Sequence, residues 1–146
     1  EGVVFLLPWI ATIDSFQHWA YANPGHSRQE RSEAWLSIRD RFGSDMDWGG
    51  LSSFMEISWQ QQGHLYGAPL YYIEYGIAQL GALQLWQTHR RDTQEALDDY
   101  AEAMTLGNTR SLPDLFSAAG LNLGFDVNHV GSLIGELNEA LSGIDS

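Results

Sequence analysis

The order of apolar and polar residues along the chain predicts helices throughout. An almost continuous apolar run over residues 3–13 leads into a mixed polar segment. Together they predict one helix with Pro8 near its first turn and an end around Tyr21, because Asn-Pro-Gly follows at residues 23–25. The run has no basic residues before it and is too short to cross a bilayer. We therefore interpret it neither as an export signal nor as a membrane anchor.

Two more helices are predicted in the first half of the chain. Ser27 and Glu30 have the spacing of a capping box, which predicts a helix that starts at Ser27, and Gly43 predicts its end. A polar turn follows over residues 44–50. After it, apolar residues at helical spacing predict a third helix over roughly residues 51–62.

The segment over residues 63–88 carries the least charge. Apart from His64, its one acid or base is Glu74. From Pro69 onward it predicts a helix of about 30 Å, at about 1.5 Å per residue, which is apolar nearly all round and should be buried on most sides. Two glycines lower its helix propensity by roughly 1 kcal/mol each, and small residues in a buried helix usually allow close packing. They are Gly76 and Gly81.

The rest of the chain has the pattern of amphipathic helices. One is predicted over residues 93–106, a short one opens with a second capping-box pattern at residues 111–114, and the last covers residues 129–141 after a loop. No strand-like alternation persists over five residues, and there is no internal repeat. The predicted fold class is all-α, a multi-helix bundle that forms a single unit over residues 1–146.

Composition narrows the functions open to such a fold. The chain has 19 acidic and 7 basic residues, a formal charge of −12 and no cysteine. It lacks a basic stripe that could hold a phosphate backbone, so nucleic acid is excluded as a partner, and an anionic membrane surface is disfavoured. Disulfides and cysteine-ligated zinc are excluded as well. The lack of cysteine and of an export signal favours a cytoplasmic protein.

Most familiar catalytic and metal-binding motifs are missing. No two of the five histidines are four residues apart, so there is no HExxH motif. Asp14 and His18 form an i,i+4 pair, for which a hydrogen bond within one helix is the favoured interpretation. Three acids could be considered for glycoside chemistry, although acids in so acidic a chain are expected on a solvated face. They are Asp45, Asp47 and Glu56.

One segment gathers neutral hydrogen-bond donors at the entry to the predicted buried helix. Beside His64, the donors at this entry are three phenols: Tyr71, Tyr72 and Tyr75. The last two should share a helical face with Gln79. Tyrosine hydroxyls stay protonated near neutral pH, and in a cleft they can donate to an oxyanion. Buried tyrosines more often pack their rings and bond a backbone carbonyl, so a structural bundle with a tyrosine-rich core remains an alternative.

Residues 64–79, HLYGAPLYYIEYGIAQ, resemble the C-terminal signature of oligoendopeptidase F, one of the thimet-oligopeptidase-like zinc metallopeptidases. The resemblance covers nearly the whole chain in order, through residues 7–21, 23–24, 30–31, 35, 41–42, 47–51, 106–116 and 119–121. It implies the C-terminal helical lobe of a zincin-type oligopeptidase with a deep substrate channel. Pro69-Leu70 stands where the family usually has Pro-Phe, a mild apolar change.

The resemblance also implies roles for the donors. His64, Tyr72 and Tyr75 would be catalytic, donating hydrogen bonds to the peptide carbonyl oxygen as it becomes negative. Tyr71 would bind the substrate backbone, or replace Tyr72 if the register differs by one. The implied substrates are short oligopeptides. The family's zinc is held by HExxH and by a glutamate on a following helix, and both lie upstream of the region matched here.

The missing HExxH determines what we expect of this chain by itself. It should be the C-terminal fragment of a longer peptidase, dependent on the upstream zinc-binding part, with no metal or other cofactor bound and no activity of its own. Apolar surface that normally packs on that part would be exposed, so we expect self-association or a marginal fold. The alternative from another class is a non-catalytic helical module that uses the same cluster to bind peptides or a partner protein.

Overall fold

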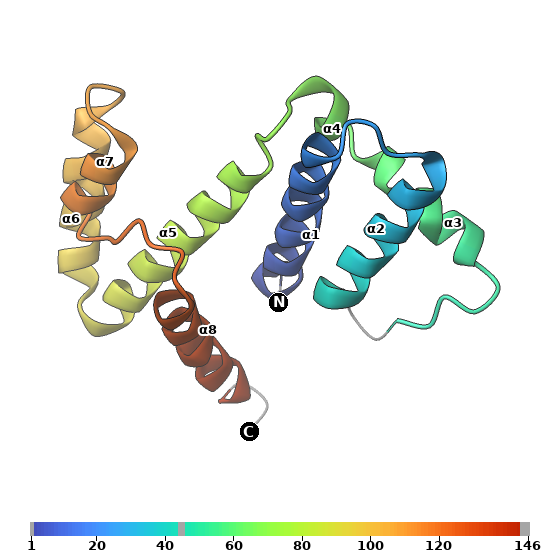
Figure 1. Cartoon of the computed structure of the whole chain (residues 1–146). Helices are drawn as coiled ribbons and strands as arrows, with labels where there is room; N and C mark the ends of the chain where they lie inside the picture. Colours follow the sequence, from blue (N-terminus) through green and yellow to red (C-terminus); the bar gives the residue numbers. More distant parts are fainter. Residues whose placement is uncertain (1, 44–45, 144–146) are drawn as a thin grey trace. The chain divides into compact units, whose positions relative to one another are not determined.

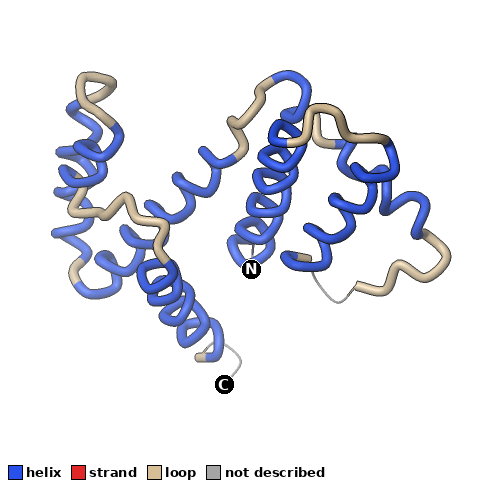
Figure 2. The backbone as a smooth tube through the Cα atoms, viewed as in Figure 1, coloured by secondary structure: helices blue, strands red, loops and turns tan. Residues whose placement is uncertain are grey.

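In the computed structural model, residues 2–43 and 46–143 are described, and all regular elements within them are helices (Figures 1 and 2). The predicted all-α class is therefore confirmed. The chain divides into two compact units, Glu1–Gly76 and Ile77–Ser146. The expectation of a single unit over residues 1–146 stays a prediction. None of the helices in the described part combines the length and apolar character needed to cross a membrane.

Helix α1 spans Gly2–Ala22, so it begins earlier than predicted. Pro8 lies inside the helix and not near its first turn. The prediction was wrong because the apolar residues before Pro8 form more than one further turn of helix, although a proline inside a helix removes one backbone hydrogen bond and crowds the carbonyl four residues earlier. The carbonyl of Pro8 accepts a bond of 2.9 Å from the Thr12 hydroxyl. The end of α1 agrees with the prediction to within one residue.

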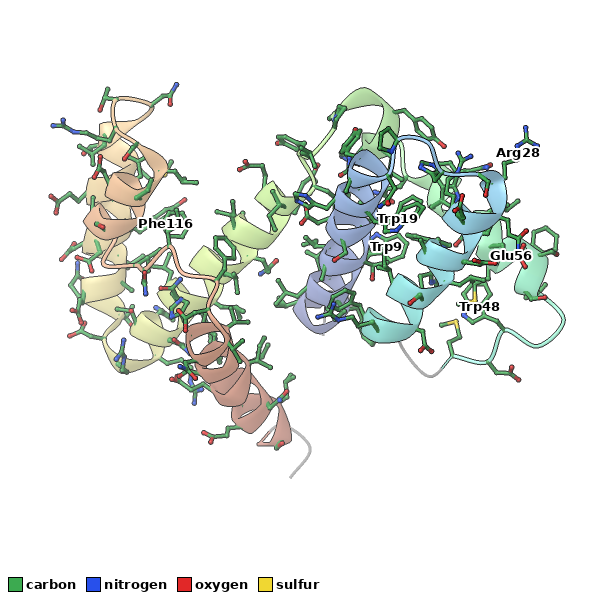
Figure 3. All side chains as sticks on the ribbon, in the orientation of Figure 1. Trp9, Trp19, Arg28, Trp48, Glu56 and Phe116 are labelled. Carbon is green, nitrogen blue, oxygen red and sulfur yellow. The ribbon has the colours of Figure 1, made fainter. Side chains whose placement is uncertain are left out.

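Helix α2 spans Arg28–Phe42 and confirms the capping box. The Glu30 backbone N–H donates to Ser27 Oγ at 3.2 Å, and the Ser27 N–H donates to the Glu30 carboxylate at 2.7 Å. The bond from the Ser27 N–H, together with a smaller contribution from the Ser27 hydroxyl, lowers the pKa of Glu30 below its ordinary value of 4.5, because both favour the charged carboxylate. The side chain of Arg28, in the same turn, points outward (Figure 3).

The core of the first unit forms where α1 and α2 lie side by side (Figure 1). Trp35 of α2 is fully buried, and its indole N–H donates to the Met55 carbonyl at 3.0 Å and to Ser58 Oγ at 3.1 Å. Trp9 and Trp19 extend from α1 toward the same region (Figure 3). The buried members of this core are Ile10, Ile13, Phe16, Trp35 and Tyr72. The tyrosine segment is thus anchored in the core of the first unit.

Short helices then lead to the predicted donor cluster. The third predicted helix is found as α3, Ser52–Ile57, continued by the 3-10 turn η1, Ser58–Gln61. Helix α4, His64–Gly67, follows, and its Leu65 packs against the core. Helix α5 covers Ile73–Arg91.

The start of α5 corrects the prediction of a helix from Pro69 onward. Leu70 has a φ of 59°, in the left-handed region, and a right-handed helix cannot pass through such a residue. The helix therefore begins only after this turn, at Ile73. Tyr72 consequently precedes α5, and it does not share a helical face with Tyr75 and Gln79 as predicted.

The second unit contains the remainder of α5 together with α6, Thr93–Leu106, α7, Leu112–Ala118, and α8, Val127–Ser142. Helices α6 and α7 lie side by side (Figure 1). Close packing at one predicted glycine is confirmed, because a Cβ atom on Gly81 would lie 3.2 Å from Cζ of Phe116. The Gln84 amide holds the loop before α8: it donates to the Asn122 carbonyl at 2.9 Å and accepts from the Asn122 N–H at 2.8 Å.

Burial of α5 is less complete than the sequence predicts. Leu80, Leu83 and Gln84 are buried, whereas Ala78 and Ala82 are exposed. A stretch rich in alanine, glycine and leucine lacks charge on every face, so its composition does not identify which face a neighbouring helix covers.

Candidate functional site

The structure brings the four predicted site residues together within the first unit. His64 is the first residue of α4, and its ring is surrounded by the three phenol rings. The ring of Tyr71 is nearly parallel to the imidazole, with centroids 6.4 Å apart and an angle of 4°. The rings of Tyr72 and Tyr75 meet the imidazole edge to face, at 5.0 and 5.6 Å. The four residues therefore form one cluster, while their individual roles stay predictions.

The backbone between α4 and α5 positions this cluster. The left-handed Leu70 reverses the chain, and the Tyr71 N–H then donates to the Ala68 carbonyl at 3.2 Å. A bond of 2.9 Å from the Glu74 N–H to the Tyr71 carbonyl starts the next helical turn. At Gly76 a Cβ atom would lie 3.4 Å from Cγ2 of Ile10 on α1, so the start of α5 packs closely on that helix. The tyrosines are thus held by local bonds and by the core.

The three tyrosines differ in how far their side chains are exposed to solvent. Tyr72 is 7% exposed and belongs to the core, whereas Tyr71 and Tyr75 are 49% and 40% exposed. The hydroxyl of Tyr75 lies 3.1 Å from Nε2 of His64. Tyr75 therefore combines an accessible phenol with a hydrogen bond to the imidazole.

Sequence reasoning did not identify Gln62, which contacts the other side of the imidazole. Its amide Nε2 lies 3.3 Å from Nδ1 of His64. Gln62 follows the 3-10 turn, and its N–H donates to the Trp59 carbonyl at 3.1 Å. The signal in the sequence was a glutamine two residues before a histidine, with a glycine between them. This spacing is not helical, so a search for residues on one helix face does not find it.

The cluster offers neutral hydrogen-bond donors, which can stabilise an oxygen atom that gains negative charge. It does not offer a metal site. Among the described residues, no three histidine, aspartate or glutamate side chains gather closely enough to hold a metal ion. The described residues therefore do not fit a zinc ion, whose ligands the family resemblance places upstream of this chain.

The remaining candidates from the sequence have structural explanations. Nε2 of His18 lies 3.5 Å from the Asp14 carboxylate, which confirms an interaction within one helix. Asp47 accepts a bond of 2.7 Å from the Gly49 N–H in its own loop, and Glu56 is exposed on α3 (Figure 3). Asp45 lies outside the described residues.

Comparison with known proteins identifies two solved structures that are similar to this chain. No family model and no curated protein matches the chain. PZ peptidase A, solved with an inhibitor, matches 95% of the chain with a TM-score of 0.87 and 32% identity. A protein assigned as an oligoendopeptidase F matches 97% with a TM-score of 0.81 and 32% identity. The resemblance to oligoendopeptidase F is confirmed. The chain spans 25% of the length of each of these two proteins, so it is similar to a part of such a peptidase.

Proposed function

We propose that this chain is the C-terminal catalytic lobe of a zinc metalloendopeptidase that hydrolyses short oligopeptides. Its contribution is a set of hydrogen-bond donors, His64, Tyr72 and Tyr75, aimed at the peptide carbonyl, with Tyr71 binding the substrate backbone. The observation that carries the proposal is the bond of 3.1 Å between His64 and Tyr75, inside a cluster of three phenols. The similarity to a quarter of two peptidases supports it.

In this proposal the zinc ion is held elsewhere in the protein. The described residues do not form a site for it, and the resemblance assigns its ligands to an upstream part that would be the partner of this lobe. In enzymes of this class, the metal supplies Lewis acidity and an activated water. The reaction would take place in the cytoplasm.

The chain's own residues act on the oxygen atom of the scissile carbonyl. As that oxygen gains negative charge, a phenol O–H or an imidazole N–H that already points at it forms a stronger hydrogen bond than it formed with the neutral carbonyl. Such a contribution lowers the barrier without tightening substrate binding.

Replacing Tyr75 tests this function. In the complete protein that contains this chain, Tyr75→Phe should keep the fold and lower kcat by about 10²–10³, the usual effect of removing one oxyanion donor, with little change in KM. The assay is cleavage of an internally quenched short peptide. Tyr66→Phe is the matched control, because Tyr66 is an exposed phenol of α4 that stacks on Trp59 at 6.2 Å and lies outside the cluster. Its kcat should not change.

The alternative, a non-catalytic module that binds peptides or a partner protein, makes a different prediction. If Tyr72→Phe and Tyr75→Phe both leave kcat unchanged, the donor assignment fails. The cluster would then serve only to recognise peptide backbone or to pack the core.

A further inference from the structure

Both ring nitrogens of His64 have a hydrogen-bonding neighbour, and the two neighbours differ in kind. Nδ1 faces the Gln62 amide nitrogen at 3.3 Å, and Nε2 faces the Tyr75 hydroxyl at 3.1 Å. A neutral imidazole has one N–H donor and one acceptor nitrogen. An amide nitrogen can only donate, whereas a hydroxyl can donate or accept. An amide whose nitrogen faces Nδ1 favours the tautomer in which Nδ1 accepts and Nε2 carries the proton.

We propose that Gln62 is a positioning residue that holds His64 in the tautomer with its proton on Nε2. This deepens the proposed function and rests on it for its consequence in catalysis. With Nδ1 accepting from Gln62, the Nε2–H of His64 donates to the oxygen of Tyr75. The hydroxyl proton of Tyr75 is then free to point at an incoming oxygen. His64, whose one N–H is used on Tyr75, acts on that oxygen through Tyr75 and not as the direct donor that the family resemblance implies.

The opposite tautomer would remove Tyr75 as a donor. If Nδ1 carried the proton, Nε2 would become the acceptor, and the Tyr75 hydroxyl would donate its one proton to His64. The same ring positions at the same distances would then offer nothing to a substrate oxygen from Tyr75. One amide thus determines whether the cluster is ready to donate.

Gln62, His64 and Tyr75 form a hydrogen-bonded relay, and local bonds hold its members in place. The backbone of Gln62 is bonded on both sides, because its N–H donates to the Trp59 carbonyl and its own carbonyl accepts from the Leu65 N–H, each at 3.1 Å. Rotation of the imidazole is restricted by the tyrosine rings, one stacked on it and two packed edge to face. The Gln62 amide is therefore presented to a ring whose orientation is already set.

Nuclear magnetic resonance reads this tautomer directly in the complete protein that contains this chain, without zinc or peptide. The protein is labelled with ¹⁵N-histidine and studied at about pH 8.5, where an ordinary imidazole is neutral. Long-range proton–nitrogen correlations distinguish the protonated nitrogen from the bare one. The correlations that disappear from the spectrum of His64→Asn are those of His64. We expect the proton on Nε2; a proton on Nδ1 would overturn the proposal.

Changing the side chain at position 62 should change the tautomer. In Gln62→Glu, the carboxylate can only accept, so the proton should move to Nδ1. In Gln62→Met, which has no amide, the two tautomers should become mixed. Gln61→Glu is the matched control, since it adds the same charge at an exposed neighbouring position and should leave the proton on Nε2. If Gln62→Glu and Gln62→Met both leave the tautomer unchanged, the proposal is wrong.

Catalysis provides a second readout that is separate from the first. In the complete protein, Gln62→Glu should lower kcat by about the same 10²–10³ as Tyr75→Phe and leave KM nearly unchanged, because both remove the same donor. In a Tyr75→Phe background it should then cause no further loss. If the tautomer responds as expected while Tyr75→Phe leaves kcat unchanged, the proposed function fails and the relay stands. If Tyr75→Phe lowers kcat but the tautomer does not respond to the substitutions of Gln62, the proposed function stands and the positioning role of Gln62 fails.

Discussion

Trp35→Phe is the substitution whose effect on stability the structure defines best. The indole is fully buried between α1, α2 and the segment that follows, and its N–H donates to the Met55 carbonyl and to Ser58 Oγ. Phenylalanine keeps an aromatic ring but loses that N–H and part of the volume. Neither acceptor is left without a partner: the Ser58 hydroxyl still donates to the Met55 carbonyl at 2.8 Å, and Arg39 still donates to Ser58 at 3.1 Å.

The expected cost is the sum of two effects. Loss of a hydrogen bond whose acceptors keep other donors costs about 1 kcal/mol. The smaller ring leaves a gap of roughly 40 Å³, which at about 24 cal/mol per Å³ adds about 1 kcal/mol. The free energy of unfolding should therefore fall by about 2 kcal/mol.

Urea unfolding followed by far-ultraviolet circular dichroism measures this loss as a lower midpoint with an unchanged slope. Trp86→Phe is the control, because Trp86 is a half-buried residue of α5 whose ring faces the Arg90 guanidinium at 5.1 Å. Its effect should stay within about 0.5 kcal/mol. A loss at Trp35 below about 0.5 kcal/mol would refute the packing described for this core.

Two further substitutions test individual hydrogen bonds. The pKa of Glu30 is lowered on folding, so its carboxylate stabilises the fold above its ordinary pKa of 4.5, and this contribution is lost as the pH falls through the lowered value. The difference in melting temperature between wild type and Glu30→Ala should therefore be larger at about pH 7 than at about pH 3, and equal differences would contradict the capping box. Gln84→Leu removes both bonds to Asn122 and should lower the free energy of unfolding by about 2 kcal/mol in urea. Gln94→Leu, at an exposed position, is its control, and equal losses in the two variants would refute the role of the buried amide.

Local signals in the sequence predicted the helices that depend on local bonds. The capping box at Ser27 and Glu30 acts within four residues, and it was found as predicted. The start of the helix after Pro69 was missed, because the left-handed turn at Leu70 has no glycine or asparagine to mark it. Propensity favours leucine within a helix, and only the surrounding structure holds it in this conformation.

The candidate site was predictable as a set of residue types but not as a geometry. His64 and the three tyrosines stand close together in the chain, so their neighbourhood was visible in the sequence. That Tyr72 is buried while Tyr71 and Tyr75 are exposed depends on packing against α1 and α2, which no local pattern records. Gln62 was missed for a related reason, since a contact across a turn follows neither the helical nor the strand period.

The most direct test of the central claim is the coding DNA in frame upstream of Glu1. If this chain is the C-terminal lobe of a zinc peptidase, that DNA should encode HExxH, followed by a helix that carries the glutamate ligand. A start codon close to Glu1, or a long upstream frame without HExxH, would contradict the peptidase account and leave the binding module.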